Sequence, residues 1–256
     1  AFLNILRSGD EIVSSASLYG GTIDLFEDLS AFGITTRYVE NNNWKEIEAA
    51  INEHTRLIFA ETIGNPCLDV TDIKKLSQIA HSHGIPLIVD NTTSTPYLIR
   101  VLEHGADIVV NSSSKYINGS SNAISGVLTD SGKFKWDKEK YPGLADYVKF
   151  GPMAFVAKIR NGLFRNIGAC LAPVNAYLNL IGIETLGLRM ERECGNAYEL
   201  AQWIEDTYPD IKVNYPGLKS SPWHDIADGE LTNGYGAIFT LRVGSKEKAF
   251  KFIDSL

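Results

Sequence analysis

Three short apolar runs in the first half of the chain each end abruptly in polar residues. The runs span residues 57–60, 87–89 and 108–110. Periodicity alone does not separate the third run from buried helix, but its β-branched residues and the Ser and Gly residues after it favour a strand that opens into a loop. Between the first two runs, the 72–83 segment has apolar residues at helical spacing, and Asp72 is placed to cap that helix or to put a negative charge in its first turn.

This alternation of strands with helices predicts a mostly parallel sheet. A second, weaker helix is indicated over 94–104, interrupted near its start by Pro96. Strands joined through helices form right-handed crossovers, so their carboxyl ends lie along one edge of the sheet. Ligands of α/β proteins bind beyond that edge. We therefore expect Asn65, Asp90 and Lys115, which follow the three runs, to converge.

The second half of the chain indicates a strand, a polar segment and then a largely helical stretch. The expected elements are a strand over 123–129, a polar surface segment over 131–147, helix over 172–208, strands over 211–215 and 237–243, and a helix over 245–256 capped by Ser245. The predicted fold class is α/β, with a mostly parallel sheet and helices on both faces over 1–185. An interdomain helix and part of a small α+β domain follow over 186–256.

The helical stretch is expected to bend and to bury an apolar stripe. Three glycines lower its helix propensity, and the stripe has helical spacing. The glycines are Gly182, Gly187 and Gly195, and the stripe consists of Ala197, Leu200, Trp203 and Ile204. A bent helix of this kind commonly joins two domains.

Lys115 and Asp90 are the candidate reactive pair. A lone lysine at a strand end is usually a solvent-exposed side chain, so its neighbours decide its meaning. A base, an acid and an amide at one crevice suit several chemistries, but an aspartate with a lysine able to form a Schiff base is the set that pyridoxal phosphate requires. A carboxylate about 4 Å from the pyridinium nitrogen stabilises it by roughly 4 kcal/mol at an effective dielectric of about 20, or about three pKa units. That interaction holds the nitrogen protonated near neutrality, and only the protonated ring is a strong electron sink.

Four motifs, in their order and spacing, resemble the Cys/Met-metabolism pyridoxal-phosphate enzymes. They are Ser17-Leu18-Tyr19-Gly20-Gly21-Thr22, Glu61-Thr62-Ile63-Gly64-Asn65-Pro66, Val89-Asp90-Asn91-Thr92 and Ser112-Ser113-Ser114-Lys115-Tyr116. Each motif alone is weak, whereas four in register are specific, and the resemblance spans nearly the whole chain. That family holds cystathionine synthases and lyases, methionine γ-lyase and the O-acetylhomoserine sulfhydrylases. Segments 150–155, 182–186, 188–192 and 213–218 are most similar to the last branch.

The resemblance implies a fold type I large domain, the cofactor pyridoxal 5'-phosphate and a role for each matching residue. Lys115 would carry the cofactor covalently and shuttle protons at Cα and Cβ of the substrate, with Tyr19 as an aid. Tyr19 would also stack on the cofactor ring, and Asp90 would pair with the ring nitrogen. Without the other motifs, Tyr19 is as readily a turn residue before two glycines, and Asp90 could be a helix cap.

The remaining matching positions concern the oxygen atoms of the cofactor. Asn65 would reach the phenolic oxygen of the ring. Ser112 and Ser114 match phosphate-contacting hydroxyls, and the period of two along a strand would place both on one face. Two positions depart from the family, because Asn111 stands where many relatives have histidine and Asn118 where glycine is usual. The loop after the lysine is therefore expected to differ in detail, while the chemistry survives.

The implied activity is a γ-replacement that converts O-acetylhomoserine and sulfide, or a thiol, to homocysteine, or a thioether, and acetate. It belongs to methionine biosynthesis and transsulfuration. A cystathionine γ-synthase or a cystathionine or methionine lyase is the alternative within the family. A catalytically incomplete fragment that keeps the fold and the subunit contacts is the alternative of another class.

The resemblance also implies functional groups outside these 256 residues. In the family, a preceding segment bears a tyrosine and an arginine for the neighbouring subunit's cofactor phosphate, and a following portion bears the arginine that grips the substrate carboxylate. We therefore expect a homo-oligomer, a dimer of dimers. Arg189, Arg192 and Arg242 are tempting substitutes for the missing arginines, but we expect each to be a surface or salt-bridge residue.

The composition agrees with a soluble enzyme that acts on small molecules. A chain of 256 residues with 44% hydrophobic content can bury a sizeable core, and a net charge of −7 gives no basic stripe for nucleic acid. No apolar run approaches the length of a membrane span, and the first residues lack the basic region of a signal peptide. Cys67, Cys170 and Cys194 are too widely spaced for a disulfide framework and suggest a reducing cytoplasm. The five histidines form no ligand set, so we expect no metal.

Overall fold

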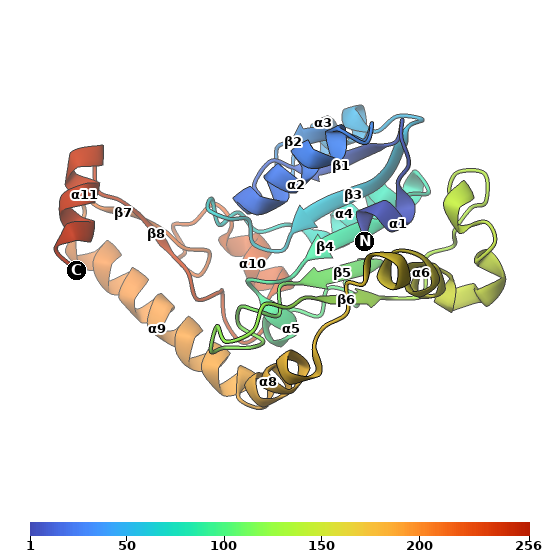
Figure 1. Ribbon diagram of the computed structural model, residues 1–256. Coiled ribbons are helices and arrows are strands. Elements are labelled where there is room, and N and C mark those ends of the chain that lie inside the picture. The colour runs from blue at the N-terminus through green and yellow to red at the C-terminus, as the bar shows by residue number, and fades with distance from the viewer.

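A six-stranded sheet forms the centre of the computed structural model, which describes residues 1–256 (Figure 1). The strands lie in the order β2-β1-β3-β4-β5-β6. They are β1 (Glu11–Ser15), β2 (Thr35–Val39), β3 (Thr55–Glu61), β4 (Leu87–Asp90), β5 (Ile108–Asn111) and β6 (Val127–Asp130). The first five strands are parallel, and β6 runs antiparallel to β5 at the edge. The mostly parallel sheet predicted from the three apolar runs is confirmed.

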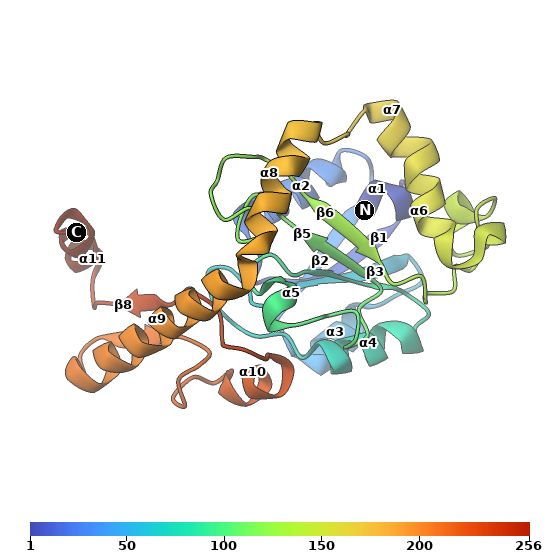
Figure 2. The ribbon, with the colours of Figure 1, turned by 90° about the horizontal axis from the view of Figure 1, so that it is seen from below.

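Helices cover both faces of this sheet, which is why its central strands are apolar throughout. Helices α1 (Phe2–Ile5), α2 (Gly20–Ser30) and α6 (Ala154–Ile159) lie on one face, and α3 (Trp44–Ala50), α4 (Ile73–Ser82) and α5 (Thr95–Leu98) on the other (Figure 2). Residues of β3 alternate between the two sides, since Leu57 belongs to the core beneath α2 and Ile58 to the core beneath α4. Asp72 caps α4 as predicted, and its carboxylate accepts a hydrogen bond from the Lys75 N–H at 2.9 Å.

A long helix leads from the first sheet to a second, two-stranded sheet. Helices α8 (Pro173–Glu184) and α9 (Leu186–Thr207) meet at Thr185, where the backbone leaves the helical region, so the predicted bend is confirmed (Figure 1). The elements after α9 are β7 (Lys212–Asn214), α10 (His224–Glu230), β8 (Thr240–Arg242) and α11 (Lys246–Asp254). Ser245 caps α11 as expected. The division into domains at residue 185 stays a prediction.

The predicted polar surface segment over 131–147 is wrong in one respect, because part of it is core. Its buried side chains are Trp136, Tyr141 and Leu144, and the Tyr141 hydroxyl donates to the carbonyl oxygen of Arg56 at 2.9 Å. Edge-to-face contacts pack Phe134, Trp136 and Tyr141 against one another, and the Trp136 ring stacks on Phe155 of α6. Short helical turns connect it onward: η1 (Pro142–Leu144), η2 (Val148–Met153), η3 (Arg160–Phe164) and α7 (Arg165–Ile167).

Three further expectations need correction. The helix expected over 94–104 is only the four-residue α5, which begins at Thr95 with a positive φ of 59° and ends where Ile99 is extended. In the stripe expected on α9, Leu200 and Trp203 are exposed, whereas Ala197 and Ile204 are buried. The strands expected over 123–129 and 237–243 are the shorter β6 and β8. No helix of the chain combines the length and the hydropathy that crossing a membrane requires.

Candidate active site

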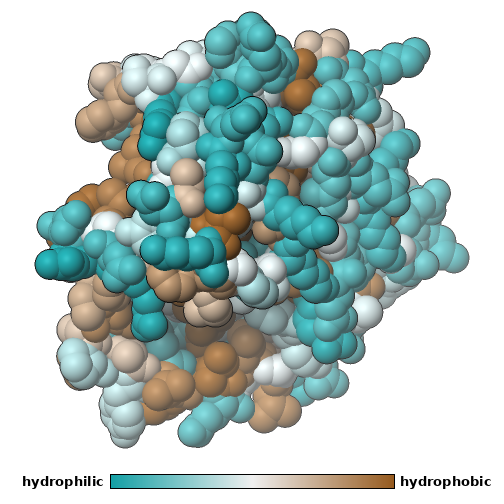
Figure 3. All heavy atoms as spheres, turned by 90° about the vertical axis from the view of Figure 1, so that its right-hand side faces the viewer, coloured by the Kyte–Doolittle hydropathy of each residue, from teal (hydrophilic) through white to brown (hydrophobic).

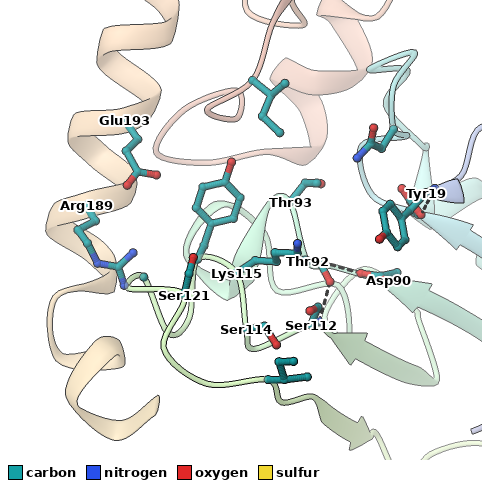
Figure 4. Close-up of a pocket in the computed structure, with 16 residues that line it drawn as sticks. Tyr19, Asp90, Thr92, Thr93, Ser112, Ser114, Lys115, Ser121, Arg189 and Glu193 are labelled. Carbon is teal, nitrogen blue, oxygen red and sulfur yellow. Dashed lines mark hydrogen bonds between the residues drawn. The ribbon is translucent and has the colours of Figure 1, made fainter. Parts of the chain in front are cut away.

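A cavity of about 660 Å³ opens at the carboxyl ends of the parallel strands (Figure 4). All six residues selected from the sequence line it: Tyr19, Asn65, Asp90, Ser112, Ser114 and Lys115. They come from the segments that follow β1, β3, β4 and β5, as the parallel arrangement requires. The expected convergence of these strand ends is thus a feature of the structure.

Lys115 lies in the tight turn after β5. Its backbone N–H donates to the carbonyl oxygen of Ser112 at 3.2 Å, and its own carbonyl oxygen accepts from the Gly119 N–H at 2.8 Å. Its ammonium group has no hydrogen bond and no carboxylate within 4.0 Å. The chain therefore places a lysine in the cavity with its reactive nitrogen free.

Ser112 and Ser114 share the cavity for a different reason from the one expected. Strand β5 ends at Asn111, so both serines belong to the turn and not to a strand with a period of two. The Ser112 N–H donates to the Thr92 hydroxyl at 2.7 Å, and the Ser114 hydroxyl accepts from the Ser125 N–H at 2.7 Å. These bonds fix the turn between the loop after β4 and the segment before β6.

Asp90 is the last residue of β4, and its carboxylate accepts a hydrogen bond from the Thr92 N–H at 2.8 Å. Burial raises the pKa of this carboxyl above its usual range, while the hydrogen bonds from Thr92 act against that rise. No Lys, Arg or His nitrogen lies within 4.0 Å to compensate its charge. The helix-cap alternative does not hold, because Ser94 occupies the cap position of α5.

Tyr19 and Asn65 face the cavity from the other two strand ends. Tyr19 precedes α2, and its ring lies along Gly21, where a Cβ atom would stand 2.6 Å from the ring. A side chain at Gly21 would therefore displace the Tyr19 ring from this position. The Asn65 side-chain amide makes no hydrogen bond within the protein, so its donors and its acceptor are available to a ligand.

The sequence analysis assigned no site role to several residues that line the cavity. Two of them, Arg189 and Glu193, project from α9 across the cavity from Tyr19 (Figure 4). Arg189 donates to the carbonyl oxygen of Gly182 at 2.9 Å and to the Thr185 hydroxyl at 3.0 Å, and it has no carboxylate partner. The expectation of a surface or salt-bridge role is therefore wrong for Arg189. Arg192 and Arg242 are exposed and lie outside the cavity.

Glu61 is a second omission, and its ionisation sets a pH dependence. Burial, followed by the neighbouring carboxylates, raises the pKa of Glu61 to about 7, whereas nearby backbone N–H groups lower it. A folded-state pKa above the usual 4.5 means that the folded chain binds the proton more tightly than the unfolded chain. The stability contributed by protonated Glu61 is thus fully present below about pH 4.5 and is lost as the pH rises to about 7.

We therefore expect Glu61→Gln to flatten the pH dependence of stability. Between about pH 4.5 and 7, the cofactor-free wild-type chain should lose about 3 kcal/mol more of its unfolding free energy than the variant does. Urea unfolding at several pH values measures this difference. If the unfolding free energy changes with pH equally in both proteins, Glu61 titrates as an ordinary carboxyl.

Comparison with known proteins identifies the family. The Cys/Met metabolism PLP-dependent enzyme family, where PLP is pyridoxal phosphate, matches residues 1–256. The chain belongs to this family. Among curated members, it is 40% identical over 278 residues to the O-acetyl-L-homoserine sulfhydrylase of Leptospira meyeri and 39% identical over 272 residues to the homocysteine synthase of Schizosaccharomyces pombe. Each alignment covers 100% of this chain and 63% of the relative, so the chain spans less than two thirds of their length.

Solved structures of family members have the same fold. The O-acetylhomoserine sulfhydrylase of Wolinella succinogenes superposes with a TM-score of 0.89 at 44% identity, covering 100% of this chain and 74% of that one. An O-acetylhomoserine (thiol)-lyase structure from Campylobacter jejuni gives a TM-score of 0.91 at 33% identity, over 98% and 66% of the two chains. That structure contains a pyridoxyl-lysine monophosphate. The fold class predicted from the sequence is thereby confirmed.

Pyridoxal 5'-phosphate is the cofactor of the family, and the cavity residues fit it. The cation-free carboxyl of Asp90 lacks only a positively charged partner, which a protonated ring nitrogen supplies. The side-chain amine of Lys115 would be available as a nucleophile to attach the cofactor covalently. The backbone and hydroxyl groups of the turn at Ser112 provide donors of the type that phosphate accepts.

Proposed function

We propose that the cavity is the active site of a γ-replacement in which O-acetylhomoserine and sulfide give homocysteine and acetate. A thiol in place of sulfide gives the corresponding thioether. The observation that supports this most directly is that Lys115 and Asp90 reach one cavity from neighbouring strand ends. The names of the relatives, O-acetyl-L-homoserine sulfhydrylase and homocysteine synthase, support the substrate and the acceptor.

Lys115 has the central role in this proposal. It would hold the cofactor covalently and, with its amine released, would take the Cα proton of the substrate as a general base. When bound, the cofactor supplies the electron sink for the charge that develops at Cα. Lys115 would also move the proton at Cβ, while the Cγ–O bond to acetate breaks and a Cγ–S bond to sulfide forms. The charge of Asp90 would favour a protonated nitrogen in the cofactor ring.

The other residues of the cavity would bind and orient the cofactor. Tyr19 would stack on the cofactor ring and assist the proton transfers, and Asn65 would bind the phenolic oxygen of the ring. Ser112 and Ser114 would bind the phosphate. The free side-chain amide of Asn65 and the exposed ring of Tyr19 support these assignments.

Substrate tests separate this proposal from a lyase or a cystathionine synthase of the same family. The protein is incubated with pyridoxal phosphate and either O-acetylhomoserine plus sulfide, O-acetylhomoserine plus cysteine, methionine, or cystathionine. We expect homocysteine and acetate from the first mixture at a rate far above the products of the others. Faster release of an oxoacid from methionine or cystathionine would instead identify a lyase.

We also propose a homo-oligomer, specifically a dimer of dimers. Helix α8 is mostly apolar but buries only Gly182, and its Val174, Tyr177, Leu180 and Ile181 are 47–64% exposed. In the face seen at the right of Figure 1, hydrophobic side chains gather in the lower part, at the level of α8 (Figure 3). Exposed apolar surface of this kind marks a protein interface.

This proposal predicts that Leu180→Asp weakens the assembly. A buried, unpaired carboxylate at an interface opposes association, so sedimentation velocity should show the wild-type chain as at least a dimer and the variant as a smaller species. Phe32→Asp changes a similarly exposed side chain beyond the end of α2 and should leave the assembly intact. A monomeric wild-type chain with full activity would contradict the oligomer.

A catalytically incomplete chain is the alternative of another class. Such a chain binds the cofactor at Lys115 but turns O-acetylhomoserine over slowly, because misplacement of a substrate by about 1 Å can cost roughly a hundredfold in rate. We propose a reducing, cytoplasmic compartment as well, because Cys67, Cys170 and Cys194 are all unpaired.

A further inference from the structure

Glu61 is a buried carboxyl group in the cavity wall that none of the proposed roles uses. It is the last residue of β3, and only 5% of it is exposed. Its register partner on β4 is Asp90. Residues in register on neighbouring parallel strands point to the same face, so the two carboxyl groups stand side by side at the edge of the sheet.

The hydrogen bond of Glu61 joins it to Tyr19. Its Oε1 atom accepts from the Tyr19 N–H at 2.7 Å, across 42 residues of chain (Figure 4). The Tyr19 carbonyl oxygen accepts only from Thr22 and Ile23 in the first turn of α2, and the Tyr19 hydroxyl makes no hydrogen bond. Glu61 is therefore the one hydrogen-bonding link between Tyr19 and another element.

The surroundings of Tyr19 make this link consequential. The residue is 57% exposed, and its ring contacts the glycine-rich start of its own helix. With more than half of Tyr19 exposed, the position of its backbone has a large share in where the ring lies. The hydrogen bond to Glu61 is made by that backbone.

Glu61 has no positively charged partner. The groups that face it are the carboxyls of Asp90 and Asp69, which oppose its ionisation, and the backbone N–H groups of Tyr19 and Asn65, which favour it. No Lys, Arg or His nitrogen lies within 4.0 Å. The groups that favour a negative charge on Glu61 are thus backbone N–H groups of the cavity wall and not cations.

We propose that Glu61 is a positioning residue that fixes Tyr19 over the cavity by accepting its backbone N–H. The inference rests on the proposed function only in that Tyr19 stacks on the cofactor there. Glu61 acts through Tyr19 and does not contact the reacting atoms.

Amide hydrogen exchange of the cofactor-free chain tests the link itself. In Glu61→Ala, the Tyr19 amide should exchange at least tenfold faster than in the wild type. In Glu61→Gln, which keeps an oxygen that can accept the same N–H, protection should be largely retained, and this variant also preserves the fold if the alanine variant does not. Asp107→Asn is the matched control, because Asp107 is another buried carboxyl that accepts a backbone N–H, from Leu87 at 2.8 Å, away from the cavity.

A double-mutant cycle on cofactor binding tests the role. The dissociation constant of pyridoxal phosphate is measured by absorbance for the wild type, Glu61→Ala, Tyr19→Ala and the double variant. If Glu61 acts through Tyr19, the Tyr19→Ala substitution weakens binding in the wild-type background but has little further effect beside Glu61→Ala. Near-wild-type exchange of the Tyr19 amide in Glu61→Ala, or fully additive effects on binding, would overturn the proposal.

The two tests also separate this proposal from the proposed function. If the cofactor attaches to a lysine other than Lys115, the proposed active site is wrong, whereas the exchange of the Tyr19 amide still decides whether Glu61 holds that residue. Attachment at Lys115 together with an unchanged Tyr19 amide would leave the function intact and refute the positioning role.

Discussion

Replacing Lys115 with alanine is expected to lower turnover of O-acetylhomoserine by about 10⁴-fold. General acid–base catalysis by one positioned group contributes roughly 10²–10⁴ in rate, and Lys115 is the proposed base at Cα and the carrier of the proton at Cβ. The variant also loses covalent attachment of the cofactor, which removes a second contribution. Steady-state formation of homocysteine from O-acetylhomoserine and sulfide measures the effect.

The free amine of Lys115 in the cavity is the reason to expect so large a loss. A matched control is Lys149→Ala, since Lys149 is an exposed lysine that does not line the cavity. It should retain wild-type activity. Activity of Lys115→Ala within tenfold of the wild type would mean that another group is the base.

Replacing Asp90 with asparagine is expected to slow exchange of the substrate Cα proton by about 10³-fold. The variant keeps the shape of the side chain but removes a charge worth roughly 4 kcal/mol to the protonated ring nitrogen at an effective dielectric of about 20. Each 1.36 kcal/mol corresponds to about a factor of ten in rate. Covalent attachment of the cofactor to Lys115 should persist, because it does not require the charge on Asp90.

Proton exchange of O-acetylhomoserine in deuterium oxide, followed by NMR, measures this effect separately from the later steps. Asp107→Asn again serves as the control, because it neutralises a buried carboxyl of the same sheet away from the cavity. Near-normal exchange in Asp90→Asn would show that this carboxylate only organises the turn at Thr92.

The strand ends could be predicted from the sequence because buried parallel strands are continuous apolar runs with an obvious end. The polar residues at and shortly after the end of each run then lie at the carboxyl ends of the strands, as Asp90 at the end of β4 and Lys115 in the turn after β5 do. Tyr19 and Asn65 came from the resemblance, since neither type of residue has a local signal that separates a ligand contact from a turn.

Features that depend on tertiary packing were not predictable in this way. Arg189 enters the cavity because α9 departs from α8 at Thr185, and its guanidinium lies against Gly119, whose φ is 74°. No local sequence pattern around Arg189 predicts that contact. Similarly, Trp136 and Tyr141 lie in a stretch of charged residues but fold into an aromatic cluster with Phe155. The charged residues of this stretch predict an exposed segment, but burial of the large aromatic side chains stabilises a packed one.

The assignment of Lys115 as the attachment site is the central claim, and chemical labelling tests it most directly. The protein is saturated with pyridoxal 5'-phosphate, reduced with borohydride, digested and mapped by mass spectrometry. We predict that the pyridoxyl group lies on the peptide containing Lys115 and that it is absent from the same peptide of Lys115→Ala. Label on a different lysine, or no label in the saturated wild-type protein, would contradict the account.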